Sequence, residues 1–179
     1  MTVNECEEQV LRLLDEVGVS DYADRMYRLI DEAQRVIACT WGFIRRKAVL
    51  TSAEGEVVPL PEDCYAIERV KNADFDLEPV EVDGEWQNGI LFSKAGEHTL
   101  IYKAYPDHIT ETDGGKLIQL APEYHAALCC YVAALTQDNE YDKRAYQLFM
   151  ERYNEKIAAV ERARQMSGKA KVVVYGRTV

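Results

Sequence analysis

Residues 117–165 are LIQLAPEYHAALCCYVAALTQDNEYDKRAYQLFMERYNEKIAAVERARQ, and they predict two consecutive helices at about 122–137 and 139–165. In both segments apolar side chains recur with the 3.6-residue period of one helical face. These side chains are Tyr124, Leu128, Tyr131, Val132 and Leu135 in the first segment, and Leu148, Phe149, Tyr153, Ile157 and Val160 in the second. A helical hairpin must bury both of its apolar stripes, so this stretch predicts a helical core.

The N-terminal residues predict a second helical hairpin. Helices are expected at about 4–17 and 20–46, because both spans carry apolar side chains at helical spacing. Asn4 followed by Glu7 resembles a helix start, and Gly18 is a typical helix stop. The longer stripe comprises Tyr22, Met26, Leu29, Ile30, Ala33, Ile37, Trp41 and Ile44. Four amphipathic helices with matching stripes are typical of a bundle.

Between the hairpins, residues 47–105 change to the two-residue period of β-strands. Strands are expected near 47–52, 56–60, 64–71, 77–82, 90–93 and 98–105, with Gly and Asn at the turns. After the last helix, Met166-Ser167-Gly168 is expected to break the helical pattern. The sequence therefore predicts an α+β fold. It is mainly a helical bundle of two hairpins, with a small antiparallel β unit inserted between them and an extended C-terminal tail.

Composition and charge narrow the class of protein. The chain of 179 residues is 47% hydrophobic and 29% charged, which is typical of a soluble domain with a sizeable core. The net charge is −10, and this disfavours binding to nucleic acid or to an anionic membrane. Residues 166–179 carry +3, so the remainder carries −13. No apolar run is long enough to span a bilayer, and the acidic N-terminus is unlike a signal peptide.

Residues that could carry catalysis or bind a metal do not form a recognisable constellation. His98, His108 and His125 lack metal-ligand spacing, so a partly exposed structural role is expected for each. The five cysteines are an odd number without a secretory signal, which indicates reduced thiols, and Cys129-Cys130 is expected to be buried and inert. Phosphate-binding and nucleotide-binding glycine motifs are absent. We therefore expect no enzyme activity and no cofactor.

Two ordered motifs resemble those of phage head–tail connector (adaptor) proteins. Residues 57–70, VVPLPEDCYAIERV, match the pattern apolar-x-Leu-Pro-x-Asp-x-x-x-apolar-x-x-Val. Residues 100–106, LIYKAYP, resemble the apolar-x-Tyr-x-x-x-Pro strand of the same proteins. They are followed by Leu120-Ala121-Pro122-Glu123-Tyr124, an Ala-rich helix, the break at 138–142 and a last helix. In order and spacing the resemblance covers roughly residues 20–165.

The resemblance implies a structural protein of a tailed phage or prophage, without catalytic residues. Such proteins form a ring, commonly of twelve copies, that docks on the portal protein and joins the capsid to the tail or stopper protein. DNA passes through the channel of the ring without specific binding, and no membrane is involved. The expected locations are the head–tail junction of the virion and, during assembly, the cytoplasm of the bacterial host.

The resemblance also suggests where the partners bind. Residues 1–165 would form a single adaptor-like domain, followed by a flexible basic tail at 166–179. By position and character, the portal-binding residues would be Lys169, Lys171, Val172, Val173, Val174, Tyr175 and Arg177. This strand-like segment could add to a partner's sheet edge, or it could be a disordered tail of no consequence. Trp86 and Phe92 are candidate subunit contacts, with ordinary packing on a sheet face as the alternative.

Two other classes of function stay open at this stage. A small cytosolic regulator or nucleic-acid-binding module would use the basic run Arg45-Arg46-Lys47, placed at the end of the second helix, and the basic tail. It predicts DNA binding whose affinity falls steeply with salt. An enzyme with scattered carboxylates and histidines would need a deep polar pocket in which strongly shifted groups converge.

Overall fold

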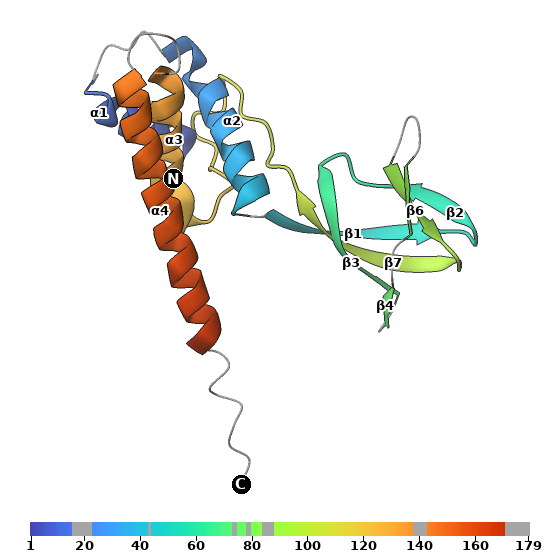
Figure 1. The fold of residues 1–179 in the computed structure, drawn as a ribbon. Helices are drawn as coiled ribbons and strands as arrows, with labels where there is room; N and C mark the ends of the chain where they lie inside the picture. The colour runs from blue at the N-terminus through green and yellow to red at the C-terminus, as the bar shows by residue number, and fades with distance from the viewer. Residues whose placement is uncertain are drawn as a thin grey trace. The chain divides into compact units, whose positions relative to one another are not determined.

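The computed structural model describes residues 1–15, 23–42, 44–72, 75–77, 80–83, 88–137 and 143–170. Within them the chain forms four α-helices, one 3₁₀ turn and seven strands, so the predicted α+β class is confirmed (Figure 1). The chain divides into two compact units, which we call the helical unit (residues 1–37 and 108–179) and the β unit (residues 38–107). The β unit thus lies in the chain between two helical segments.

Helix α1 spans Val3–Leu13 and begins with a capping box. The Thr2 hydroxyl accepts from the Glu5 amide, and the Glu5 carboxylate accepts from the Thr2 amide. The N-cap of the helix is therefore Thr2, two residues before the predicted start at Asn4. The helix also ends earlier than the predicted residue 17, because Asp15 has the left-handed φ of 60° that often follows a helix.

Helix α2 spans Ala23–Thr40, so the prediction of a helix to residue 46 is wrong. Trp41 and Ile44 continue the helical spacing, but Gly42 follows directly and is a helix stop. Strand β1 begins at Ile44 and alternates between partly buried and exposed side chains. Pairing with a long partner strand outweighs the helical pattern at this point.

Helix α3 (His125–Gln137) follows a 3₁₀ turn, η1 (Pro122–Tyr124), as the proline at 122 predicts. The helix packs against α1 and against α4. It is buried on nearly all sides, including Ala127, Cys130 and Ala133, instead of along a single stripe. Whether α1 and α2 form a hairpin stays a prediction, because the connection at 16–22 lies outside the described residues.

Helix α4 spans Lys143–Ala170 and packs against α3 through Phe149, Tyr153 and Ile157. The expected break at Met166-Ser167-Gly168 is wrong, since one glycine in an exposed helix costs only about 1 kcal/mol. Residues 166–170 are therefore helical and do not belong to an extended tail. The predicted break at 138–142 lies outside the described residues.

The strands form two antiparallel sheets. Their bounds are Ile44–Ser52 (β1), Glu56–Pro59 (β2), Cys64–Asn72 (β3), Phe75–Leu77 (β4), Val80–Asp83 (β5), Asn88–Phe92 (β6) and Gly96–Ala104 (β7). The strand order is β1-β7-β3-β4 in one sheet and β2-β6-β5 in the other. Two register shifts interrupt β3 where it pairs with β7, and such bulges bend a strand.

The core of the β unit consists of alternate residues from these strands. Strand β7 turns His98, Leu100, Tyr102 and Ala104 inward, and this confirms the alternation that the sequence predicts for its apolar residues. Val70 from β3 and Ile90 and Phe92 from β6 complete the buried cluster. The two-residue period therefore places one face of β7 in the core.

Gly89 in β6 is expected to be intolerant of any side chain. A Cβ at this position would lie 2.7 Å from Val57 Cγ1 and 2.9 Å from the Val58 carbonyl oxygen. Gly89→Ala is therefore expected to lower the free energy of unfolding by about 1–3 kcal/mol, measured by urea denaturation. Gly115→Ala is the control, because a Cβ there meets nothing within 4 Å. Equal stability of the two variants would contradict the tight contact.

Candidate interaction surfaces

The residues predicted to bind a portal lie at and beyond the end of α4. Lys169 belongs to the last turn of the helix, although its side chain is not described. The others, which are Lys171, Val172, Val173, Val174, Tyr175 and Arg177, lie outside the described residues. Trp86, a candidate subunit contact, lies outside them as well. The portal-binding role therefore stays a prediction.

Phe92, the other candidate subunit contact, is 3% exposed, so the expectation of an exposed side chain is wrong. Its ring stacks on His98, with 4.0 Å between ring centroids. His98 is fully buried, and its Nε2 lies 3.0 Å from Ser52 Oγ. The alternative of ordinary packing inside the β unit therefore describes Phe92 correctly.

The other two histidines also have structural partners in the helical unit. His108 Nδ1 lies 3.0 Å from an Asp31 carboxylate oxygen, and His108 Nε2 lies 2.9 Å from Arg35 Nη2. The His125 Nε2 atom lies 3.2 Å from the Leu120 carbonyl oxygen. Within the described ranges no group of three His, Cys, Asp or Glu side chains is arranged to hold a metal ion.

Arg46 on β1 joins two acidic segments of the β unit. Its guanidinium donates to Asp63 at 2.7 Å and to Asp107 at 2.8 Å. Asp63 precedes β3, and Asp107 follows β7. These contacts, with the hydrogen bond to Asp107 as the largest cause, raise the pKa of Arg46 above its usual value. The cation therefore fixes the points where the chain enters β3 and leaves β7.

Asp63 also connects the two motifs that resemble connector proteins. The Tyr102 hydroxyl donates to the Asp63 carboxylate at 3.1 Å, and the Tyr105 amide donates to the Asp63 carbonyl at 2.8 Å. The Tyr65 and Tyr105 rings are 5.0 Å apart between centroids. Burial is the main cause that raises the pKa of Tyr102, and the bond to Asp63 adds to it. The Leu-Pro-Glu-Asp turn and the Leu-Ile-Tyr strand are thus one structural cluster.

The basic run Arg45-Arg46-Lys47 lies in β1, so its placement at a helix end is wrong. Arg45 Nε donates to both carboxylate oxygens of Glu68, at 2.9 and 2.8 Å. Arg46 is engaged by Asp63 and Asp107 as described above. Two of the three cations are therefore paired with acids of the same unit, which reduces the charge that a phosphate backbone would meet.

Arg46→Ala is expected to lower the free energy of unfolding by about 1–2 kcal/mol. The change leaves the carboxylates of Asp63 and Asp107 without their shared guanidinium donor, and Asp63 keeps the hydrogen bond from the Tyr102 hydroxyl. Arg45→Ala is the matched control on the same strand, because its guanidinium is 68% exposed and an exposed pair contributes less than about 1 kcal/mol. Both variants would be compared by urea denaturation. A larger loss for Arg45→Ala would refute the bridging role of Arg46.

Helix α4 is anchored to the rest of the helical unit as far along as Arg164. The Tyr124 hydroxyl donates to Glu161 at 2.9 Å, and the Arg164 guanidinium lies over the Tyr124 ring at 4.8 Å. Arg164 also contacts the Glu123 carboxylate at 3.2 Å. Met166 is 73% exposed, and the last turns of α4 extend past the other helices of this unit (Figure 1). The helix therefore carries residue 170 away from the helical core.

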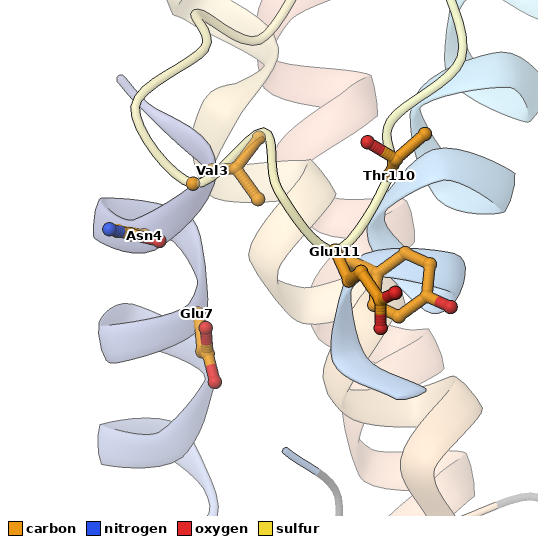
Figure 2. Close-up of a pocket in the computed structure, with 7 residues that line it drawn as sticks. Val3, Asn4, Glu7, Thr110 and Glu111 are labelled. Atoms are coloured by element: carbon orange, nitrogen blue, oxygen red, sulfur yellow. The ribbon is translucent and has the colours of Figure 1, made fainter. Parts of the chain in front are cut away.

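A polar hollow of about 190 Å³ lies between α1, α2 and the loop that follows β7. Figure 2 shows Asn4 and Glu7 on α1, with Thr110 and Glu111 on the loop opposite. Its described lining residues include the carboxylates of Glu7 and Glu111 and do not include a histidine. In the part of the chain that the structure describes, no helix has the length and apolar character needed to cross a bilayer.

Asp63 and Tyr102 are the centres of the two motifs that resemble those of phage head–tail connector proteins, and they meet in the folded chain. Comparison with protein families agrees with this resemblance. The chain belongs to the SU10 adaptor protein family, a phage head–tail adaptor family, which it matches over residues 1–174. No curated protein matches the chain. Membership makes the protein a phage adaptor, which is a structural class and not a catalytic one.

Proposed function

We propose that this chain is the head–tail connector of a tailed phage or prophage. It forms a ring, with twelve copies expected, that docks on the portal protein, continues the DNA channel and presents a surface to the tail or stopper protein. Membership of the SU10 adaptor protein family supports this role. The structural observation that supports the proposal is the exposed end of α4, the helix that leads in the sequence into the basic segment.

The length of α4 suits a docking arm. The helix has 28 residues, which corresponds to about 42 Å. Its buried contacts end near Ile157, and its polar contacts with Tyr124 and Glu123 end at Arg164. Residues 166–179 contain Val172–Val174, three cationic residues and no acidic residue. A short basic segment rich in β-branched residues, placed after a long helix, is well suited to adding as a strand to the edge of a partner's sheet.

The charge of the chain suits a channel that DNA crosses. The net charge is −10, and residues 166–179 carry +3. The rest of the chain therefore carries −13 and repels phosphate. Arg45 and Arg46, the cations that a nucleic-acid-binding module would use, are held by Glu68, Asp63 and Asp107. These pairs favour passage of DNA over binding of DNA.

The β unit offers an exposed apolar pair as a subunit contact in place of Phe92. Val57 on β2 and Leu91 on β6 are partners in the sheet register, so their side chains lie on the same face. They are 46% and 37% exposed. An apolar cross-strand pair of this kind is a suitable contact for a neighbouring subunit in a ring.

The proposal is tested by mixing the full chain with the portal protein encoded beside it. Size-exclusion chromatography with light scattering is expected to show the mass of a portal ring plus a ring of this protein. Retention of the two proteins as separate species at both low and high salt would contradict the proposal. A parallel titration with duplex DNA tests the alternative function, which requires binding that weakens steeply as salt rises.

A further inference from the structure

Two cysteines that are far apart in the sequence meet inside the helical unit. Cys6 on α1 and Cys129 on α3 have their Sγ atoms 3.9 Å apart. Their side chains are 0% and 2% exposed. The Cys129 thiol also donates to Gln9 Oε1 at 3.4 Å, so the Cys6 thiol is the donor toward Cys129. The two sulfur atoms therefore already face each other.

Cys129 is the member of the pair that borders a hollow. It lines a mostly apolar hollow of about 320 Å³ between α1, α3 and α4, whose lining does not include Cys6. The hydrogen bond from Cys6 is the largest cause that lowers the pKa of Cys129, and burial opposes it. The same hydrogen bond and burial raise the pKa of Cys6. The thiolate, which is the reactive form, is therefore favoured at Cys129.

We propose that Cys6 and Cys129 form a thiol-oxidation site in which a hydroperoxide oxidises Cys129 and Cys6 closes a disulfide. The Cys129 thiolate attacks one peroxide oxygen, the O–O bond breaks, and the other oxygen leaves as hydroxide or alkoxide. The product is a sulfenic acid at Cys129. The sulfur of Cys6 then attacks the sulfenic sulfur, its proton leaves with the hydroxyl as water, and the disulfide forms.

The geometry requires a small movement for this step. The sulfur separation must shorten from 3.9 Å to roughly 2 Å, which is within reach of side-chain rotation. Cys130 also lines the hollow, but adjacent helical residues point about 100° apart, so it is directed away from the Cys6–Cys129 line. Cys39 and Cys64 belong to the β unit. Cys6 is thus the thiol placed to react with Cys129.

The disulfide would lock α1 onto α3. The start of α1 is already held by bonds from the Val3 and Asn4 amides to the carbonyls of Lys116 and Gly114. A covalent link at Cys6 adds a second fixed point, one turn further along the helix. On the proposed function, the protein is made in a reducing cytosol and carried outside it in the particle, so the lock would close after release.

The test uses the purified full chain and hydrogen peroxide, and it needs no phage partner. After oxidation, free thiols are alkylated in denaturant and the digest is analysed by mass spectrometry. A peptide pair joined through Cys6 and Cys129, reversed by dithiothreitol, is expected, together with a melting temperature that rises on oxidation. Cys129 found as sulfinic acid while Cys6 is alkylated would overturn the proposal, as would a disulfide between other cysteines.

Two variants keep the interpretation clear. Cys6→Ala is expected to abolish the joined peptide and to leave a sulfenic acid at Cys129 that dimedone traps. Cys130→Ala is the matched control, because Cys130 is equally buried and lies on the same helix, and it should leave disulfide formation unchanged. Loss of the joined peptide in Cys130→Ala would overturn the assignment. Failure to bind a portal would count against the proposed function and would not affect the proposed oxidation of Cys6 and Cys129.

Discussion

Replacing Tyr124 by alanine is expected to lower the free energy of unfolding by about 3–5 kcal/mol, the range for a large buried aromatic side chain. Tyr124 is 0% exposed and is the largest of the fully buried side chains. Its ring lies under the Arg164 guanidinium, and its hydroxyl donates to Glu161. Burial is the main cause that raises its pKa to about 12. Alanine would leave a cavity and also release the middle of α4 from η1.

Tyr124→Phe separates the two parts of this effect. It keeps the ring and removes the hydroxyl, so a loss of about 1 kcal/mol is expected for the hydrogen bond to Glu161. Urea denaturation followed by circular dichroism measures both variants, and amide hydrogen exchange along α4 shows whether its middle has been released. Similar losses in the two variants would show that the hydroxyl, and not the ring, holds the helix.

Ending the chain after Ala170 is expected to weaken portal binding at least about a hundredfold, or about 2.7 kcal/mol. The truncation keeps α4 and removes Val172–Val174, Lys171 and Arg177. An added strand contributes main-chain hydrogen bonds and pocket contacts, so its loss removes most of such an interface. The affinity would be measured by surface plasmon resonance on an immobilised portal ring. Unchanged affinity would refute the tail as the docking segment.

A charge-reversal series distinguishes strand pairing from simple attraction. The double variant Lys171→Glu with Arg177→Glu keeps the apolar residues, so it reports the electrostatic part of binding alone. The double variant Arg12→Glu with Arg162→Glu is the matched control, because it changes the net charge by the same amount through exposed residues of α1 and α4. If the two double variants weaken binding equally, the effect belongs to net charge and not to the tail.

The elements of the fold could be predicted where the sequence has one clear period. The alternation of Leu100, Tyr102 and Ala104 predicts β7, and the spacing of Phe149, Tyr153 and Ile157 predicts the buried face of α4. The ends of the helices are harder to predict, because the free-energy differences between continuing and stopping a helix are small. Gly42 ends α2 although apolar spacing continues beyond it, whereas Gly168 does not end α4.

The candidate site was less predictable, since its contacts join residues that are distant in the sequence. Periodicity places Cys6 and Cys129 on buried faces but says nothing of their meeting across α1 and α3. The motif around Asp63 is apparent in the sequence. Its pairing with Arg46 is not, because the sequence predicts a helix at Arg46 where the structure has strand β1. Phe92 could be placed on a strand but not on its inner face, because the short β6 pattern lacks clear alternation.

The two ends of the sheet in the β unit are neighbours, and this affects how the protein can evolve. Ile44 and Ala104 are direct partners in the register of β1 and β7, so the chain enters and leaves the sheet about 5 Å apart. A segment with neighbouring ends behaves as a cassette, which recombination or design can exchange without reshaping its host. Such an exchange would give the adaptor a new β unit while its helical unit stays as it is.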